Sequence, residues 1–215
     1  MAVAVLGLGR FGTRLVQELT NTGVEVLAVD RDPARVNDVA EVAFLAAEGD
    51  IVDFEFVQSL ALNEYRTVVV AIGSDIAASV HLTLTLKRRL SLPHVVAKAS
   101  TTDHAVALEL AGADIVVSPE QEAAVRLAHT LGSRHVGDYL SLGPDYGVAN
   151  VDAPEILRGR PVSEAKLLDK FHVVLLARIR GNSVHFNPDQ SELVQPGDRW
   201  LIAGRDEHLR RLDVR

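Results

Sequence analysis

The sequence predicts an α/β fold in which a doubly wound parallel sheet is followed by a small C-terminal α+β domain. Short and nearly all-apolar runs alternate with helical patterns from residue 2 to residue 118, and such runs are typical of parallel strands that are buried on both faces. A stretch rich in Gly, Asp and Pro, GDYLSLGPDYGVANVDAP, then interrupts the alternation. We therefore expect one domain at 1–133 and a second at 134–215.

The chain begins with a strand, a glycine loop, a helix and a second strand. The apolar run AVAVL is followed by Gly7, Gly9 and Gly12, which are spaced G-x-G-x-x-G. A helical pattern then runs to a stop at Gly23, and the next apolar run, VEVLAV, ends at Asp30. In this context the glycine spacing is typical of the nucleotide-binding turn of a Rossmann-like domain.

Four more strands and five helices complete the expected first domain. The strands are predicted at 42–46, 67–73, 94–99 and 114–119. Apolar periodicity and start and stop signals predict helices at 33–40, 53–61, 75–90, 101–112 and 119–131.

The smaller C-terminal domain is expected to combine three strands with two helices. We predict strands at 147–152, 172–180 and 199–205, a short helix at 162–169 and a terminal helix from residue 206. The stretch NPDQSELVQPGD carries the turn signals between the last two strands. One sequence does not determine how these strands pair.

Each glycine of the loop has its own expected role, and a carboxylate follows. Gly7 permits a tight turn, Gly9 lets backbone N–H groups approach a pyrophosphate, and Gly12 lets the helix pack close to the sheet. The helix N-terminus adds partial positive charge. Asp30 comes about twenty residues later, where it could accept hydrogen bonds from ribose hydroxyls; the alternative is a turn-forming role. Asp30 disfavours the 2′-phosphate of NADP, although the adjacent Arg31 could accommodate it.

Composition and charge argue against several classes of protein. The 215-residue chain has no cysteine, which excludes disulfides and thiolate metal sites and suits a reducing cytoplasm. Its net charge of −7 has the wrong sign for a protein that mainly neutralises nucleic-acid phosphates. No apolar run approaches the roughly 20 residues that span a bilayer, so we expect any membrane association to come through a partner.

The main alternative function is an NAD-dependent oxidoreductase, because the same glycine loop serves such enzymes. A dehydrogenase needs a proton donor at the nicotinamide. The eight histidines show no H-E-x-x-H or comparable spacing, and the sequence has neither a G-x-S-x-G elbow nor a P-loop. A redox-sensing transcription factor would need a basic recognition helix, which is not visible. We therefore expect neither an enzyme nor a nucleic-acid-binding protein.

Six motifs follow one another along the first domain: GLGRFGTRLVQEL, VLAVDRDPARV, EGDIVD, VVVAIGSDIAAS, VVAKAS and GADIVVSPEQEAAVRLA. In that order they resemble the RCK domains that regulate potassium transport, of the TrkA and KtrA type. The later stretches ILRGRPVSEAKLLDKFHVVLLARIRGN and LVQPGDRWLIAGRDEHLRRL resemble the small C-terminal domain of the same family, TrkA-C. The resemblance covers nearly the whole chain and is more specific than the glycine loop alone.

The resemblance implies a cytoplasmic regulatory subunit at the inner face of the plasma membrane, bound to a membrane-embedded potassium-translocating subunit of the KtrB or TrkH type. It also implies dimers that assemble into an octameric ring, whose shape changes with the bound nucleotide. ATP and ADP are the ligands of the KtrA type, and TrkA relatives also bind NAD or NADH. All of these share the adenosine half, so the signal for this chain stays open. A ligand shifts the ring only if it binds two ring shapes differently.

The resemblance also implies site residues. The expected nucleotide-binding residues are Gly7, Gly9, Arg10, Phe11, Gly12, Asp30, Arg31, Gly49, Asp50, Ala71, Ile72, Gly73 and Lys98. Arg10 matches an arginine that reaches the terminal phosphate, and Glu120 matches a glutamate associated with a divalent cation such as Mg²⁺ near the γ-phosphate. The alternatives are that Arg10 points to solvent, that Lys98 pairs with a surface acid, and that Glu120 only complements a helix start.

The chain departs from the family in its C-terminal domain. Some relatives bind cyclic di-AMP there with isoleucines and an arginine, but in PVSEAKLLDKFHVV the arginine position is Leu168. Ser163 and Glu164 lie nearby in the sequence, and Lys166 is the cation that could compensate. This departure disfavours cyclic di-AMP as a ligand.

Overall fold

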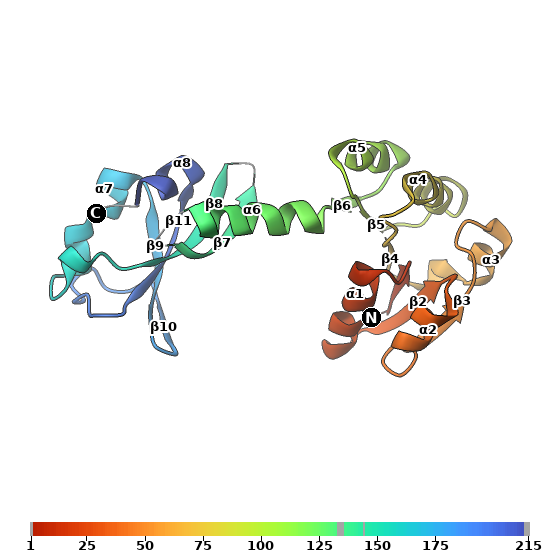
Figure 1. The fold of residues 1–215 in the computed structure, drawn as a ribbon, viewed down its shortest axis with the longest axis horizontal. Helices are drawn as coiled ribbons and strands as arrows, with labels where there is room; N and C mark the ends of the chain where they lie inside the picture. Colours follow the sequence, from red (N-terminus) through yellow and green to blue (C-terminus); the bar gives the residue numbers. More distant parts are fainter. Residues whose placement is uncertain (1, 133–135, 144, 213–215) are drawn as a thin grey trace. The chain divides into compact units, whose positions relative to one another are not determined.

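The computed structural model describes residues 2–132, 136–143 and 145–212. They form two compact units, one that extends to Glu120 and one that begins at Gln121, and each is described by itself (Figure 1). The expected domain boundary between residues 133 and 134 lies outside the described residues.

The first unit is built on a parallel sheet of six strands. The strands are β1 (Ala2–Leu6), β2 (Glu25–Asp30), β3 (Leu45–Glu48), β4 (Thr67–Val70), β5 (Val95–Lys98) and β6 (Ile115–Val117). Their order is β3-β2-β1-β4-β5-β6, and each neighbouring pair is parallel. The order reverses between β1 and β4, and ligands of such sheets bind outside the carboxyl ends of the strands at this switch point.

Different helices cover the two faces of this sheet (Figure 1). The helices are α1 (Arg10–Asn21), α2 (Pro33–Val39), α3 (Phe54–Ser59), α4 (Ile76–Leu84), α5 (Thr102–Ala111) and α6 (Pro119–Gly132), of which α6 continues into the second unit. Side chains alternate across a strand, so Val5 of β1 packs with Val16 of α1, whereas Leu6 packs with Leu82 of α4 and Leu108 of α5. Each fully buried Val or Leu of this kind contributes about 1.5–3 kcal/mol.

The third strand lies later in the chain than the apolar stretch 42–46 predicts. The backbone N–H groups of Val42 and Ala43 donate to the carbonyl oxygen of Val39, at 3.0 and 2.8 Å, and thereby close the end of α2. Pairing with β2 begins only at Leu45, opposite Leu27. The predicted start was three residues too early, because Val42 and Ala43 serve the helix end, whereas Leu45 and Ala46 belong to the strand.

The second unit is built on an antiparallel sheet of five strands in the order β10-β9-β11-β8-β7. The strands are β7 (Val136–Gly143), β8 (Tyr146–Asp152), β9 (Val174–Arg180), β10 (Ser183–Phe186) and β11 (Arg199–Arg205). The fully buried side chains of Trp200 and Ile202 in β11 are at the centre of a separate core. The expected fold class, a Rossmann-like domain followed by a small α+β domain, is confirmed.

Strands β7 and β10 were not predicted, and for β7 the cause is its glycine content. A Cβ on Gly147 of β8 would lie 2.3 Å from the ring of Tyr139, and a Cβ on Gly137 would lie 1.8 Å from the guanidinium of Arg199. Gly147 makes room for a side chain on the paired strand β7, and Gly137 makes room for one on β11, which lies beyond β8 in the sheet. Their density therefore reports close packing of side chains in this sheet.

The short helix expected at 162–169 forms two separate turns. Val162–Ala165 is a 3₁₀ turn, Lys166 has a left-handed backbone with a φ of 47°, and α7 spans Leu167–Phe171. The N–H of Val162 donates to the carbonyl oxygen of Glu192, which ties the first turn to another loop. The two turns therefore cannot merge into one helix. Leu168 of α7 is exposed.

A helix, α8, begins at Asp206 and ends at Leu209, where a terminal helix was expected. None of the helices described here is both long enough and apolar enough to span a membrane.

An ion pair in the second unit predicts how its stability depends on pH. Asp198 has a fully buried side chain that accepts two hydrogen bonds from Arg180, at 2.6 and 2.8 Å, and one from the backbone N–H of Gln195, at 2.8 Å. Burial acts to raise the pKa of Asp198, but these donors outweigh it and hold the pKa below its ordinary value. A depressed carboxyl pKa stabilises the fold above the unfolded-state pKa of about 4, and this contribution is lost as the pH falls through the folded-state pKa.

We therefore predict that Asp198→Ala lowers the free energy of unfolding at pH 7 by about 2 kcal/mol, because it removes hydrogen bonds to a buried charge. The difference between variant and wild type should shrink below about pH 4. Urea unfolding monitored by tryptophan fluorescence measures both effects. The control is Asp169→Asn, on the exposed side of α7. A difference that is the same at pH 3 and pH 7 would contradict this account.

Candidate nucleotide-binding site

The carboxyl ends of all six parallel strands surround a cavity of about 490 Å³ in the first unit. The residues that line it come from the loops after these strands and from the helix starts; they are Gly7, Gly9, Arg10, Phe11, Asp30, Arg31, Arg35, Ile51, Val52, Ala71, Ile72, Gly73, Ser74, Asp75, Ala78, Lys98, Ser100 and Glu120. The cavity lies where the strand order predicts a ligand site.

Two glycines of the loop are required by the fold itself. Gly7 has a φ of +103°, which favours glycine, and its N–H donates to the carbonyl oxygen of Val29 at 2.8 Å. A Cβ on Gly12 would lie 1.9 Å from the carbonyl oxygen of Gly7 and 3.3 Å from the Cβ of Ala71. The start of α1 therefore packs directly against the loop and the neighbouring strand end, and Gly12 does not line the cavity as the described residues define it.

Gly9 differs from the other two. Its φ of −69° is open to any residue, and a Cβ added to it would meet no atom of the described chain within 4 Å. Gly9 nevertheless lines the cavity. Gly9 therefore has no conformational or packing role in the fold. Its missing side chain instead leaves space for a ligand to approach the backbone.

The N-terminus of α1 leaves its donors available. Within the described residues its N-cap, Gly9, supplies no side-chain hydrogen bond, and its first turn carries no acidic residue. By contrast, α2, α3, α4 and α5 are capped by the side chains of Asp32, Asp53, Asp75 and Thr101. Unsatisfied N–H groups and the helix dipole favour an anion at such an end.

Asp30 holds the loop in place while it faces the cavity. Its Oδ2 accepts a hydrogen bond from the N–H of Leu8 at 2.6 Å, and its Oδ1 accepts one from the N–H of Asp32 at 2.9 Å. Its side chain is only 7% exposed. A carboxylate has about four acceptor positions, so Asp30 retains capacity for a ribose hydroxyl. The turn-forming role and the ribose role are therefore compatible.

Arg35 is a cavity residue that the sequence analysis missed. Its guanidinium lies 3.5 Å from Oδ2 of Asp30 and 3.4 Å from Oδ2 of Asp32. The sequence could have indicated Arg35 by its position five residues after Asp30, because the first turn of α2 places residue 35 close to the end of β2. It places a second arginine beside Arg31 at this end of the cavity.

Lys98 and Glu120 contact one another. The Nζ of Lys98, a largely buried residue at the end of β5, lies 2.7 Å from Oε1 of Glu120, whose side chain is 61% exposed. The hydrogen bond from Lys98 holds the pKa of Glu120 below its ordinary value, and the charge of Arg10 acts in the same direction. Both residues line the cavity. Gly73 leaves room for this lysine, since a Cβ there would lie 3.0 Å from Nζ.

Besides Gly12, two more of the expected residues, Gly49 and Asp50, do not line the cavity. Gly49 donates its N–H to the carbonyl oxygen of Asp30, and a Cβ on it would collide with the ring of Phe56. Asp50 accepts from the N–H of Val52 at 3.0 Å and shapes the turn. In the described residues the wall at this point is formed by Ile51 and Val52. Apolar side chains suit the face of a planar base.

No cluster of three or more His, Asp or Glu side chains suited to a metal ion occurs in the described residues. Glu120 would therefore bind a cation with one carboxylate, and the cation would need further oxygen ligands from a bound phosphate.

The fold and the cavity together define a class of protein: a doubly wound α/β domain with a cavity at its switch point, joined to a small antiparallel module. Residues 3–119 match the family model described as the TrkA-N domain, and the chain belongs to this family. It is 34% identical to the Ktr system potassium uptake protein C of Bacillus subtilis over 212 residues, which cover 99% of this chain and 96% of that protein. It is 32% identical to the Ktr system potassium uptake protein A of Vibrio alginolyticus over 206 residues, which cover 96% and 93%.

A solved structure shares the fold over nearly the whole chain. The GsuK channel bound to NAD has a TM-score of 0.65 at 17% identity, over 97% of this chain and 38% of that chain. The matched region is thus less than half of the longer GsuK protein. The resemblance to the RCK family that the motifs indicated is confirmed.

The glycines provide a matched test of the site. We predict that Gly9→Ala leaves the free energy of unfolding unchanged within about 1 kcal/mol but weakens adenine-nucleotide binding by about tenfold or more, because the added methyl group faces the cavity. Gly12→Ala should instead destabilise the first unit by about 3 kcal/mol, because its Cβ overlaps a carbonyl oxygen. Thermal unfolding and calorimetric titration with ADP measure both. Equal loss of stability in the two variants would contradict the assignment.

Proposed function

We propose that this chain is a cytosolic, nucleotide-binding regulatory subunit of a potassium uptake system. The observation that supports it most directly is the uncapped N-terminus of α1 at a cavity wall where Gly9 has no role in the fold. The physiological context comes from the relatives, which are potassium uptake proteins and which this chain matches over nearly their whole length.

The proposed ligand is an adenine nucleotide. The α1 N-terminus would take the phosphates, and Asp30 would accept from the ribose. Ile51, Val52 and Ile72 would contact the base. ATP and ADP suit the cavity because Arg10 and Lys98 line it and can meet extra phosphate charge. NAD or NADH shares the adenosine half, and one solved structure with this fold is a channel bound to NAD.

Glu120 is proposed to help hold a divalent cation such as Mg²⁺ at the terminal phosphate. Its exposed carboxylate forms an ion pair with Lys98, and its lowered pKa favours the ionised form that a cation would need. When bound, the cation would neutralise phosphate charge. On nucleotide binding, the ion pair between Lys98 and Glu120 would be replaced. Glu120 would then contact the cation, and Lys98 would contact a phosphate.

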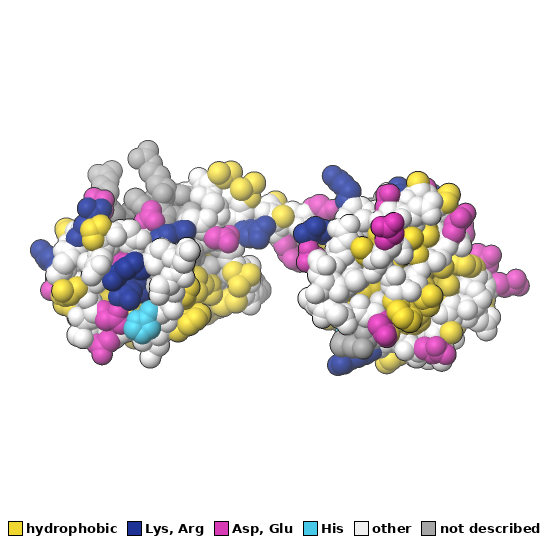
Figure 2. Space-filling model, turned by 90° about the horizontal axis from the view of Figure 1, so that it is seen from below, with side chains coloured by type: hydrophobic (Ala, Val, Ile, Leu, Met, Phe, Trp, Pro, Cys, Tyr) yellow, Lys and Arg dark blue, Asp and Glu magenta, His cyan; other side chains and the backbone are white. Residues whose placement is uncertain are grey.

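The proposed assembly is a dimer that forms an octameric ring on a membrane-embedded potassium-translocating subunit of the KtrB or TrkH type. Such a ring can control transport only if the nucleotides stabilise different ring shapes. DNA is not proposed as a partner. Figure 2 shows one face of the described residues, where acidic and basic side chains are interspersed, and the chain carries a net charge of −7.

An NAD-dependent oxidoreductase remains the alternative that shares the cavity. Within the described residues the cavity is lined by no His or Tyr, and Lys98, its one lysine, is engaged by Glu120. A hydride-transfer enzyme needs a proton donor beside the reacting carbon. Together with the relatives, this favours regulation over catalysis.

Arg10 offers the sharpest test of nucleotide discrimination. We predict that wild type binds ATP and ADP with different affinities and different ring shapes, and that Arg10→Ala reduces this discrimination by about tenfold through loss of a charge-assisted hydrogen bond. Calorimetry and size-exclusion light scattering, each with and without Mg²⁺, measure both. The control is Arg14→Ala, one turn later on α1, where Arg14 pairs with Glu18 and lies outside the cavity.

If Arg10→Ala separates the two nucleotides as well as wild type does, Arg10 does not recognise the terminal phosphate. If no adenine nucleotide binds to the wild-type chain at millimolar concentration, the proposed function itself is wrong.

Glu120→Gln should have opposite effects with and without a divalent cation. In EDTA we predict that the variant binds ADP about two- to fivefold more tightly, because Lys98 is released from a partly exposed pair worth at most about 1 kcal/mol. With Mg²⁺ it should bind ATP less tightly than wild type, because a cation ligand is lost. Glu122→Gln, on an exposed part of α6, is the control. A change of the same sign in both buffers would refute the shared role of Glu120.

A further inference from the structure

The second unit has its own cavity, of about 150 Å³. It lies between strands β8 and β11 and the turns that precede and form α7. The side chains that line it are Val151, Asp152, Pro154, Ile156, Leu157, Glu164, Ala165, Leu167, Lys170, Phe171, Trp200, Ile202 and Leu212. We call it the C-terminal cavity.

The walls of the C-terminal cavity are mainly apolar. Leu157, Trp200 and Ile202 are buried and also belong to the core of this unit. A cavity of about 150 Å³ is large enough to hold a benzene molecule. The space therefore suits a flat or branched apolar body of about that size.

The polar groups at this cavity that lack a partner are donors. The buried indole Nε1 of Trp200 has no hydrogen-bond partner among the described residues. Lys170, which is exposed on α7, has a side chain without an ion pair or hydrogen bond in the described part of the chain. Lys170 is therefore the charged donor that is available to a ligand at this cavity.

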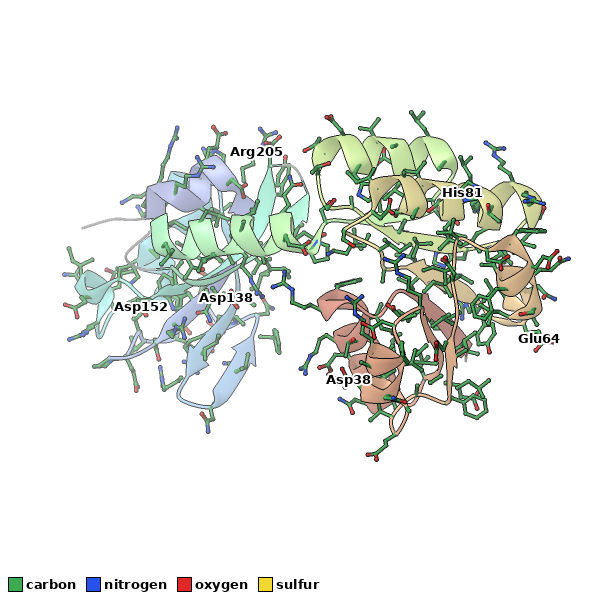
Figure 3. The ribbon with its side chains drawn as sticks, turned by 45° about the vertical axis from the view of Figure 1, so that its right-hand side comes forward. Asp38, Glu64, His81, Asp138, Asp152 and Arg205 are labelled. Carbon is green, nitrogen blue, oxygen red and sulfur yellow. The ribbon has the colours of Figure 1, made fainter. Side chains whose placement is uncertain are left out.

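The acidic residues at the same cavity already have arginines nearby. Glu164 lies 3.3 Å from Arg160. Asp152, labelled in Figure 3, lies 3.9 Å from Arg199. The uncompensated charge at the opening is thus the ammonium of Lys170, which favours an anionic group over a cationic one.

We propose that the C-terminal cavity binds a small organic monocarboxylate, with a benzene-sized apolar body in the cavity and its carboxylate at Lys170. The free-energy cost of removing water from the ammonium of Lys170 is offset by its charge-assisted hydrogen bond to the carboxylate. The site is separate from the nucleotide cavity, so it can stand or fall independently of the proposed regulatory function.

The test uses the single tryptophan of the chain, Trp200, as a local probe. Benzoate is titrated into the ¹⁵N-labelled full-length chain, and the indole N–H cross-peak is followed; benzyl alcohol, a neutral molecule of similar size, is titrated in parallel. We expect a saturable shift with benzoate and about tenfold weaker binding of benzyl alcohol, because the alcohol lacks the charged acceptor.

Lys170→Gln should remove the preference for benzoate over benzyl alcohol without changing the binding of the alcohol. Lys166→Gln, an exposed neighbour that does not line the cavity, is the matched control and should retain the preference. The proposal is overturned if the indole signal does not respond to benzoate, if both molecules bind equally well, or if the two lysine variants behave alike. A shift that depends on protein concentration instead of benzoate would assign this surface to a second copy of the chain and would also overturn it.

Discussion

The contact between the glycine loop and the start of α1 is the constraint on which the first unit depends. Gly12 lies so close to the carbonyl oxygen of Gly7 that no side chain fits, and Asp30 fixes the same loop through the N–H of Leu8. Together they place the helix N-terminus at the cavity wall, while Val16 on the same helix is buried against the sheet. The free donors of α1 are thus held in position by core packing, which is what a preorganised anion site requires.

Charge at this site is arranged in pairs that a ligand can exchange. Lys98 is held by Glu120, and Arg35 lies close to Asp30, whereas Arg10 and Arg31 make no ion pair within the described residues. One member of each pair is more than half exposed. Such pairs contribute little to stability, so replacing one by a phosphate contact costs little. The arrangement favours binding that responds to the number of negative charges on the ligand.

The two units bury their cores with different kinds of sheet, and the kind of sheet decides where each unit can form a cavity. In the first, a parallel sheet covered on both faces leaves its loops free to form the cavity. In the second, an antiparallel sheet packs around Trp200, with glycines at Gly137 and Gly147 that make room for neighbouring side chains. Each unit carries a cavity of its own. If both cavities bind the proposed ligands, the protein would have the minimum needed for coupling between them, provided that both sites bias the same conformational change.

The sequence by itself determined the order of strands and helices in the first unit, the glycine loop with Asp30, and the family, because these depend on local periodicity and on short motifs. It could not join Lys98 to Glu120, since that contact links the ends of two neighbouring strands. Arg35 was missed although it lies only five residues after Asp30, in the helix that follows the same strand. The sequence pattern did not predict strand β7 and it predicted one helix around Lys166, because cross-strand packing and a left-handed residue decide those conformations. The sequence determines the local chemistry. The tertiary structure decides which charges pair and how much space lies beside each glycine, because both depend on residues that are distant in the chain.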